Sequence, residues 1–137
     1  MPRNPERTAE ARAWFGKAAN DLRAAELDIG AAPPLLEDAL FHCQQATEKS
    51  LKGFLFWNDS PFSKTHSLEK LGEQCLALDN TLRALVDRTV PLTQYVWKFR
   101  YPGEPEPPTV DEAKEALLLA REVYEAVLSR LPGEVRL

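Results

Sequence analysis

Residues 41–55 read FHCQQATEKSLKGFL, and this stretch is the most informative part of the sequence. Its apolar side chains recur at the three- and four-residue spacing of an α-helix, so they form a stripe that can enter a core. Together with the residue just before the stretch, the stripe consists of Leu40, Cys43, Thr47, Leu51, Phe54 and Leu55. The pattern predicts a helix that is buried on one side.

A row of hydrogen-bonding side chains lies beside this stripe. His42, Gln45 and Lys49 stand at positions i, i+3 and i+7, so at about 100° per residue they share one face of the predicted helix. Two interpretations remain open. Either the row lines a cleft or a partner surface, or it consists of long polar side chains that cover the flanks of an ordinary bundle helix.

The composition is that of a soluble globular protein with one domain. The chain has 137 residues, of which 44% are hydrophobic and 28% are charged, and this length suffices for one hydrophobic core. Its formal net charge is −4, so no overall basic field attracts nucleic acid, although a local basic site is compatible with this charge. No run of about 18 apolar residues is present, so we expect no membrane span.

The N-terminus and the cysteines indicate a cytoplasmic protein. The first seven residues, MPRNPER, are polar and contain two prolines, which is unlike a signal peptide. Cys43 and Cys75 lie in helical patterns beside apolar residues and lack the spacing of a metal site. We therefore expect two buried, reduced thiols and no bound metal.

Five helices are expected, over about residues 8–29, 35–57, 68–78, 81–99 and 110–131. Ser67 is a good N-cap for the third helix, and Thr109 or Asp111 caps the last one. Pro91 lies in the middle of the fourth helix, where it kinks the helix or splits it in two. Because strand patterns are absent and the loops between long helices are short, we predict an all-α, up-down antiparallel bundle. It forms a single domain with its core over about residues 8–131.

Aromatic side chains are concentrated on the first two predicted helices. Such side chains either build the core or mark a face on which two copies of the chain associate. Both roles remain open for Trp14, Phe15, Phe54, Phe56 and Trp57.

A second polar cluster, WKFRYPG at residues 97–103, precedes the last helix. Lys98 and Arg100 supply donors for an anion, and Tyr101 offers a hydroxyl group and a stacking face. Arg100 stands at a helix end, where its fork of donors can hold a phosphate or a carboxylate. The competing interpretation pairs Arg100 with an acid of another helix, such as Glu48.

Three motifs in order make the chain resemble the HEPN domain family of small, all-helical prokaryotic proteins. They are FHCQQATEKSLKGFL at residues 41–55, THSLEKL at 65–71 and RYPG at 100–103, and the resemblance covers about residues 9–131. It implies a five-helix up-down bundle that is commonly a homodimer. It also implies a minimal nucleotidyltransferase partner, or an RNA- or nucleotide-related role, in toxin–antitoxin or stress systems.

One departure from the family argues against ribonuclease activity. Ribonuclease members carry an Arg, four to six intervening residues and then a His, which acts as acid and base while the Arg holds the phosphate. After Arg100 these positions hold Pro105, Glu106 and Pro107. The family's catalytic pair is therefore absent, and we assign no catalytic residue.

The remaining histidine of the chain stands just before the third helix. His66 lies between Thr65 and Ser67, where local hydrogen bonds allow it to organise the loop. Alternatively, it reaches the region of Arg100.

The resulting hypothesis is a non-catalytic or weakly catalytic module of the HEPN type. It binds a nucleotide or RNA phosphate, or docks a nucleotidyltransferase, and needs no cofactor beyond a nucleotide ligand. The surface that we predict for this consists of His42, Gln45, Lys49, Lys98, Arg100 and Tyr101. Two alternatives remain open: a purely structural homodimer, in which the same polar row joins two copies, and a divergent ribonuclease toxin.

Overall fold

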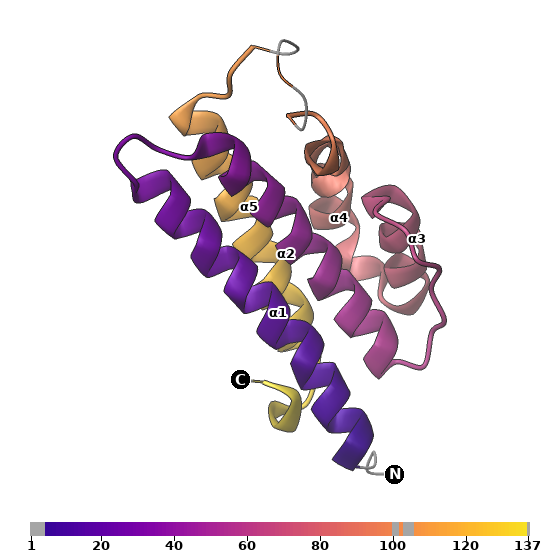
Figure 1. The fold of residues 1–137 in the computed structure, drawn as a ribbon. Helices are drawn as coiled ribbons and strands as arrows, with labels where there is room; N and C mark the ends of the chain where they lie inside the picture. Colours follow the sequence, from indigo (N-terminus) through magenta and orange to yellow (C-terminus); the bar gives the residue numbers. More distant parts are fainter. Residues whose placement is uncertain (1–4, 100–101, 103–105, 137) are drawn as a thin grey trace.

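The computed structural model describes residues 5–99, 102 and 106–136. Within these residues there are α-helices and short 3-10 helices and no β-strand, so the predicted all-α fold is confirmed (Figure 1). The α-helices are α1 (Pro5–Gly30), α2 (Leu36–Trp57), α3 (Leu68–Leu78), α4 (Arg83–Thr89) and α5 (Val110–Ser129). The 3-10 helices are η1 (Asn80–Leu82), η2 (Val90–Val96) and η3 (Gly133–Val135).

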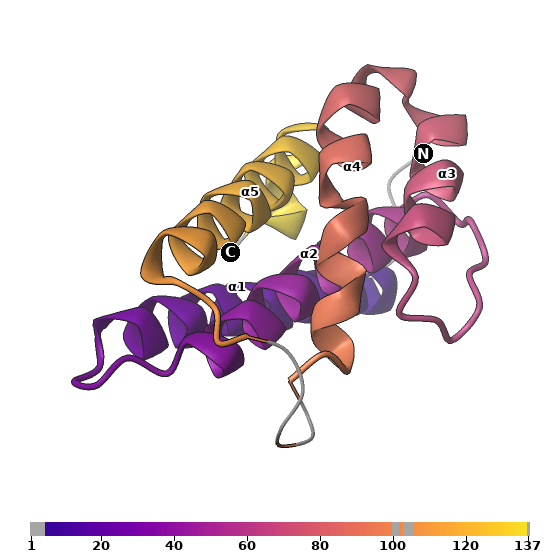
Figure 2. The ribbon, with the colours of Figure 1, turned by 90° about the horizontal axis from the view of Figure 1, so that it is seen from above.

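Helix α2 is the centre of the bundle. It packs against α1, α3, α5 and η2, and Figure 1 shows it as the antiparallel neighbour of α1 with α5 behind the pair. Figure 2 shows that α4 and η2 cross the α1–α2 pair steeply. The predicted stripe of α2 enters the core, since Leu40, Leu51 and Leu55 have no exposed surface.

A glycine allows α1 and α2 to approach closely. A Cβ atom at Gly53 would lie 2.8 Å from Cε2 of Phe15, which is fully buried. Phe54 and Trp57 are also buried in this core. Trp14 is only partly buried, and its ring meets that of Phe62 edge-on at 5.9 Å. These contacts assign Phe15, Phe54 and Trp57 to the core.

The helix ends follow the predicted caps. The Ser67 side chain accepts a hydrogen bond from the backbone N–H of Lys70, and Thr109 caps α5 in the same way. The predicted start of the first helix at residue 8 was wrong, because α1 already includes Pro5. Proline is tolerated in the first turn, where its missing N–H would have no helical partner.

The fourth predicted helix is split at the expected place. The α-helical part ends at Thr89, and the chain continues as the 3-10 helix η2, in which Pro91 is the second residue. Because proline has no N–H and clashes with the preceding turn, it disfavours a continuous α-helix here. None of the described helices is long and apolar enough to cross a membrane.

Candidate functional site

The polar row on α2 contacts an acid of α1. Nδ1 of His42 lies 2.8 Å from Oδ1 of Asp21, and the ammonium group of Lys49 donates to Oδ2 of Asp21 at 2.6 Å. Gln45 donates instead to the side-chain oxygen of its neighbour Gln44, at 2.7 Å. Two members of the row therefore share one carboxylate, which joins α2 to α1.

Asp21 was not among the predicted site residues, although the sequence holds a signal for it. It is only 7% exposed and lies on the same face of α1 as the buried Ala18, Leu22 and Ala25. An acid at a core-facing position of a helix needs a partner, because a buried charge without one is costly. The sequence does not show which helix supplies that partner.

A second buried acid, Glu48, organises the other polar contacts of α2. It is 4% exposed and accepts hydrogen bonds from Gln44 at 3.0 Å and from the ammonium group of Lys52 at 3.0 Å. Nδ1 of His66 lies 2.9 Å from Glu48 Oε1. Burial by itself would raise the pKa of Glu48, but the hydrogen bonds from Gln44, His66 and Lys52 lower it below its ordinary value.

His66 joins its loop to α2 through these contacts. The His66 ring contacts the Glu48 carboxylate, and the His66 backbone carbonyl accepts a hydrogen bond from the Gln44 side chain at 3.4 Å. Next to it, the Thr65 hydroxyl accepts from the backbone N–H of Ser67 at 3.0 Å. The loop before α3 is therefore tied both to itself and to the central helix.

The second predicted cluster lies at the end of η2, where the structure describes part of it. Nζ of Lys98 lies 5.8 Å from the ring centroid of Tyr95 and 5.4 Å from that of Phe99. These two rings are stacked, with centroids 6.0 Å apart and planes 9° apart. Trp97 is 55% exposed. Two further predicted site residues, Arg100 and Tyr101, lie outside the described residues.

A pocket of about 370 Å³ lies between the start of α2 and the end of η2. Three aromatic residues and two acids are among the residues that line it, which are Glu37, Asp38, Phe41, Tyr95, Val96 and Phe99. The Tyr95 hydroxyl donates to Glu112 of α5 at 2.9 Å, and burial, together with this carboxylate, raises the pKa of Tyr95 above its ordinary value. The ring is thus fixed from the side facing α5.

The two cysteines are free thiols in the core. Cys43 and Cys75 are both buried and form no disulfide, so their predicted burial is confirmed. Burial raises the pKa of each thiol to about 12. Neither cysteine is therefore a nucleophile at neutral pH, because the thiolate is the reactive form.

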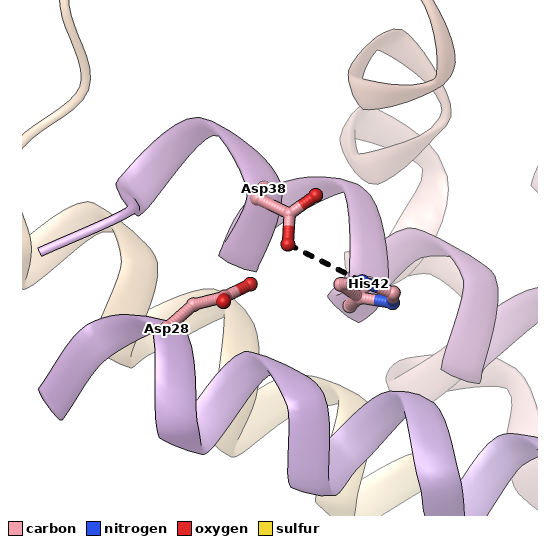
Figure 3. A group of neighbouring side chains, drawn as sticks. All are labelled: Asp28, Asp38 and His42. Atoms are coloured by element: carbon pink, nitrogen blue, oxygen red, sulfur yellow. Dashed lines mark ion pairs between the residues drawn. The ribbon is translucent and has the colours of Figure 1, made fainter. Parts of the chain in front are cut away.

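One group of side chains in the described part of the chain has ligand types and spacing that suit a metal ion. It consists of Asp28 at the end of α1 and of Asp38 and His42 on α2 (Figure 3). Burial, and then the neighbouring Asp38 carboxyl, raise the pKa of Asp28 to about 6. Asp38 also lines the aromatic pocket, so the two features adjoin.

The fold and these motifs define a small helical bundle of the HEPN type. The HEPN domain family model matches residues 11–131, and the chain therefore belongs to the HEPN family. The crystal structure of TT1696 from Thermus thermophilus is similar, with 31% sequence identity and a TM-score of 0.73 over 88% of this chain and 98% of that chain. No curated protein matches the chain. The resemblance inferred from the three motifs is thus confirmed.

Proposed function

We propose that this chain is the HEPN subunit of a two-component nucleotidyltransferase or toxin–antitoxin system, and that it binds a nucleotide or a nucleotide unit of RNA. The binding site is the pocket between α2 and η2. The observation that carries the proposal is the aromatic wall of this pocket with a lysine beside it. The pocket volume of about 370 Å³ falls within the range of small-molecule sites.

The pocket wall suits a nucleobase. Phe41 of α2 and the stacked pair Tyr95 and Phe99 offer aromatic rings, and stacking on such rings contributes about 1–3 kcal/mol per base. Glu37 also lines the pocket, and carboxylates accept hydrogen bonds from the exocyclic amino groups of bases. We therefore expect adenine, cytosine and guanine nucleotides to bind more tightly than uridine nucleotides.

In this proposal Lys98 binds the phosphate. Its ammonium group lies over the ring of Phe99, next to the pocket, and the chain continues from there into Arg100 and Tyr101. A hydrogen bond to a charged group contributes about 1.5–3 kcal/mol, so a few such contacts give a dissociation constant in the micromolar to millimolar range. Because the net charge is −4, RNA binding is expected to be local and to weaken strongly with salt.

The polar row on α2 has a supporting role in this proposal. Lys49 and His42 share the buried carboxylate of Asp21, so they hold α2 against α1. His42 also lies beside Asp38, which lines the pocket. A change at Lys49 is therefore expected to lower stability more than it lowers ligand affinity.

Calorimetric and thermal-shift titrations test the proposal. The ligands are ATP, AMP, UMP and a short single-stranded RNA, and the variants are Lys98→Ala and Arg100→Ala. Lys114→Ala, which removes an exposed lysine of α5, is the matched control. We expect saturable binding and a raised melting temperature in the wild type and in the control, and a clear loss of both in the two variants. Equal affinity in Lys98→Ala and the wild type would refute the site.

A purely structural homodimer is the competing function, and exposed apolar side chains favour it. Leu27, Trp97 and Leu118 are 64%, 55% and 58% exposed, and tryptophan is enriched in protein–protein interfaces. Sedimentation velocity on the wild type and on Trp97→Ala separates the two functions. A dimer that Trp97→Ala dissociates, in a protein that binds none of the ligands, would leave an interaction module without a nucleotide site.

A further inference from the structure

Three side chains from two helices converge beside the pocket. Asp28 comes from α1, and Asp38 and His42 come from successive turns of α2. Each offers one ligand atom, and these atoms all lie within 4.8 Å of one another. Figure 3 shows the Asp28 carboxylate pointing across from α1 toward the other two side chains.

The His42 ring has one nitrogen, Nε2, that can bind a metal ion together with Asp28 and Asp38. Nδ1 lies 2.8 Å from Oδ1 of Asp21, and since an ionised carboxylate only accepts hydrogen bonds, Nδ1 carries the hydrogen. Nε2 then faces Asp38 Oδ2 at 3.4 Å. In metal sites, a histidine that binds through one nitrogen commonly donates its other N–H to a carboxylate, which fixes the ring. In this chain Asp21 is the carboxylate that accepts the Nδ1–H of His42.

The Asp28 carboxylate supplies an independent observation. Its Oδ2 atom is buried and has no hydrogen-bond partner among the described residues. A buried acceptor without a donor is costly, and such an atom requires an explanation. Two carboxylates and the Nε2 atom of His42 thus share one small space, and a cation there would give the Oδ2 atom a partner.

We propose that Asp28, Asp38 and His42 bind a divalent transition-metal ion, with Asp21 as the residue that orients His42. One imidazole nitrogen and two carboxylate oxygens form a mixed ligand set that suits Zn²⁺ or Co²⁺, whereas Mg²⁺ and Ca²⁺ prefer sites built from oxygen alone. Three protein ligands leave a position for water or for an oxygen of a bound ligand.

The proposed metal site lies next to the aromatic pocket in which we propose that the nucleotide binds. Asp38 belongs to both features, so a bound cation would offset the negative charge of the acids that line the pocket. Metal binding itself does not depend on the nucleotide proposal, because water can fill the position that the three protein ligands leave open.

Titration of the metal-free full chain, prepared with a chelator and without a polyhistidine tag, tests the site. Co²⁺ binding is followed by visible absorption and Zn²⁺ binding by calorimetry. We expect one equivalent to bind, and we expect Asp38→Asn and Asp28→Asn each to weaken affinity at least about tenfold, as changes around metal ligands do. Glu10→Gln, which changes an exposed acid of α1, is the matched control and is expected to bind like the wild type.

One further variant and one control keep this test decisive. Circular dichroism checks that all three asparagine variants remain folded, and Asp21→Asn is expected to weaken binding about 10- to 100-fold while leaving all three ligands in place. Absence of saturable binding in the wild type would overturn the proposal. Unchanged affinity in Asp28→Asn and Asp38→Asn would overturn it as well, because the bound ion would then lie elsewhere.

Discussion

Replacement of Glu48 by glutamine tests the buried polar network of α2. Glu48 is 4% exposed and Lys52 is 8% exposed, so the carboxylate and the ammonium group are almost fully removed from water. Breaking a buried ion pair by removing one partner costs about 3–5 kcal/mol. Glutamine keeps the volume and one acceptor oxygen, so we expect Glu48→Gln to lower the free energy of unfolding by about 2–4 kcal/mol at pH 7.

A double-mutant cycle separates the pair from the rest of the network. Urea unfolding is measured for Glu48→Gln, Lys52→Met and the double variant, and we expect a coupling energy of about 1.5–3 kcal/mol. The matched control is Glu122→Gln, which breaks the exposed pair of Arg88 and Glu122, 3.2 Å apart with side chains 58% and 39% exposed. This change is expected to cost less than about 1 kcal/mol.

The pH dependence of the same variant has a definite sign. The pKa of Glu48 is lower in the folded chain than its ordinary value of 4.5, so its contribution to stability is present above that value and is lost as pH falls through the folded pKa. The difference between wild type and Glu48→Gln is therefore expected to shrink at low pH. A variant as stable as the wild type at pH 7, or a coupling energy near zero, would refute the account of this network.

Two further predictions concern packing and the buried thiols. Gly72→Ala places a Cβ atom 2.3 Å from Cγ1 of Val86 and is expected to cost about 1–3 kcal/mol in urea unfolding. By contrast, Gly16→Ala meets no atom within 4 Å and is expected to stabilise α1 by about 0.5–1 kcal/mol; equal effects of the two changes would contradict the close packing of α3 on α4. Cys43 and Cys75, whose pKa values are raised to about 12 by burial, are expected to resist a thiol-specific disulfide reagent until the chain unfolds. Rapid labelling of the native protein would contradict their burial.

The central helix was predictable because its pattern is local. The apolar side chains from Leu40 to Leu55 recur at the spacing of an α-helix within the single helix α2, and the side chains at that spacing are buried. The caps at Ser67 and Thr109 were predictable for the same reason, because each hydrogen bond spans only three residues. The break at Pro91 follows from the missing N–H of proline.

The contacts between helices were not predictable in the same way. His42 and Lys49 meet Asp21 across the α1–α2 interface, and the partner depends on the register of the two helices, which no local pattern encodes. The sequence marks Asp21 and Glu48 only as acids at core-facing positions. Their partners become known once the helices are packed.

The aromatic pocket depends on tertiary structure even more strongly. Its walls come from the first turns of α2 and from the end of η2, and they meet because α4 and η2 cross the central helix steeply (Figure 2). A pattern read along the chain gives neither this crossing angle nor the 3-10 form of η2. The residues next to Lys98 in the sequence were enough to predict it as a ligand-binding residue, whereas Phe41 and Tyr95 were not predicted to line a site.

Nuclear magnetic resonance tests the nucleotide site most directly. Proton–nitrogen correlation spectra of the labelled full chain are recorded during titration with AMP, for the wild type and for Lys98→Ala. We expect saturable shifts concentrated at the amides of Phe41, Tyr95 and Phe99 in the wild type, and much weaker binding in the variant. Shifts confined to other parts of the bundle, or no shifts at all in the wild type, would contradict a nucleotide site between α2 and η2.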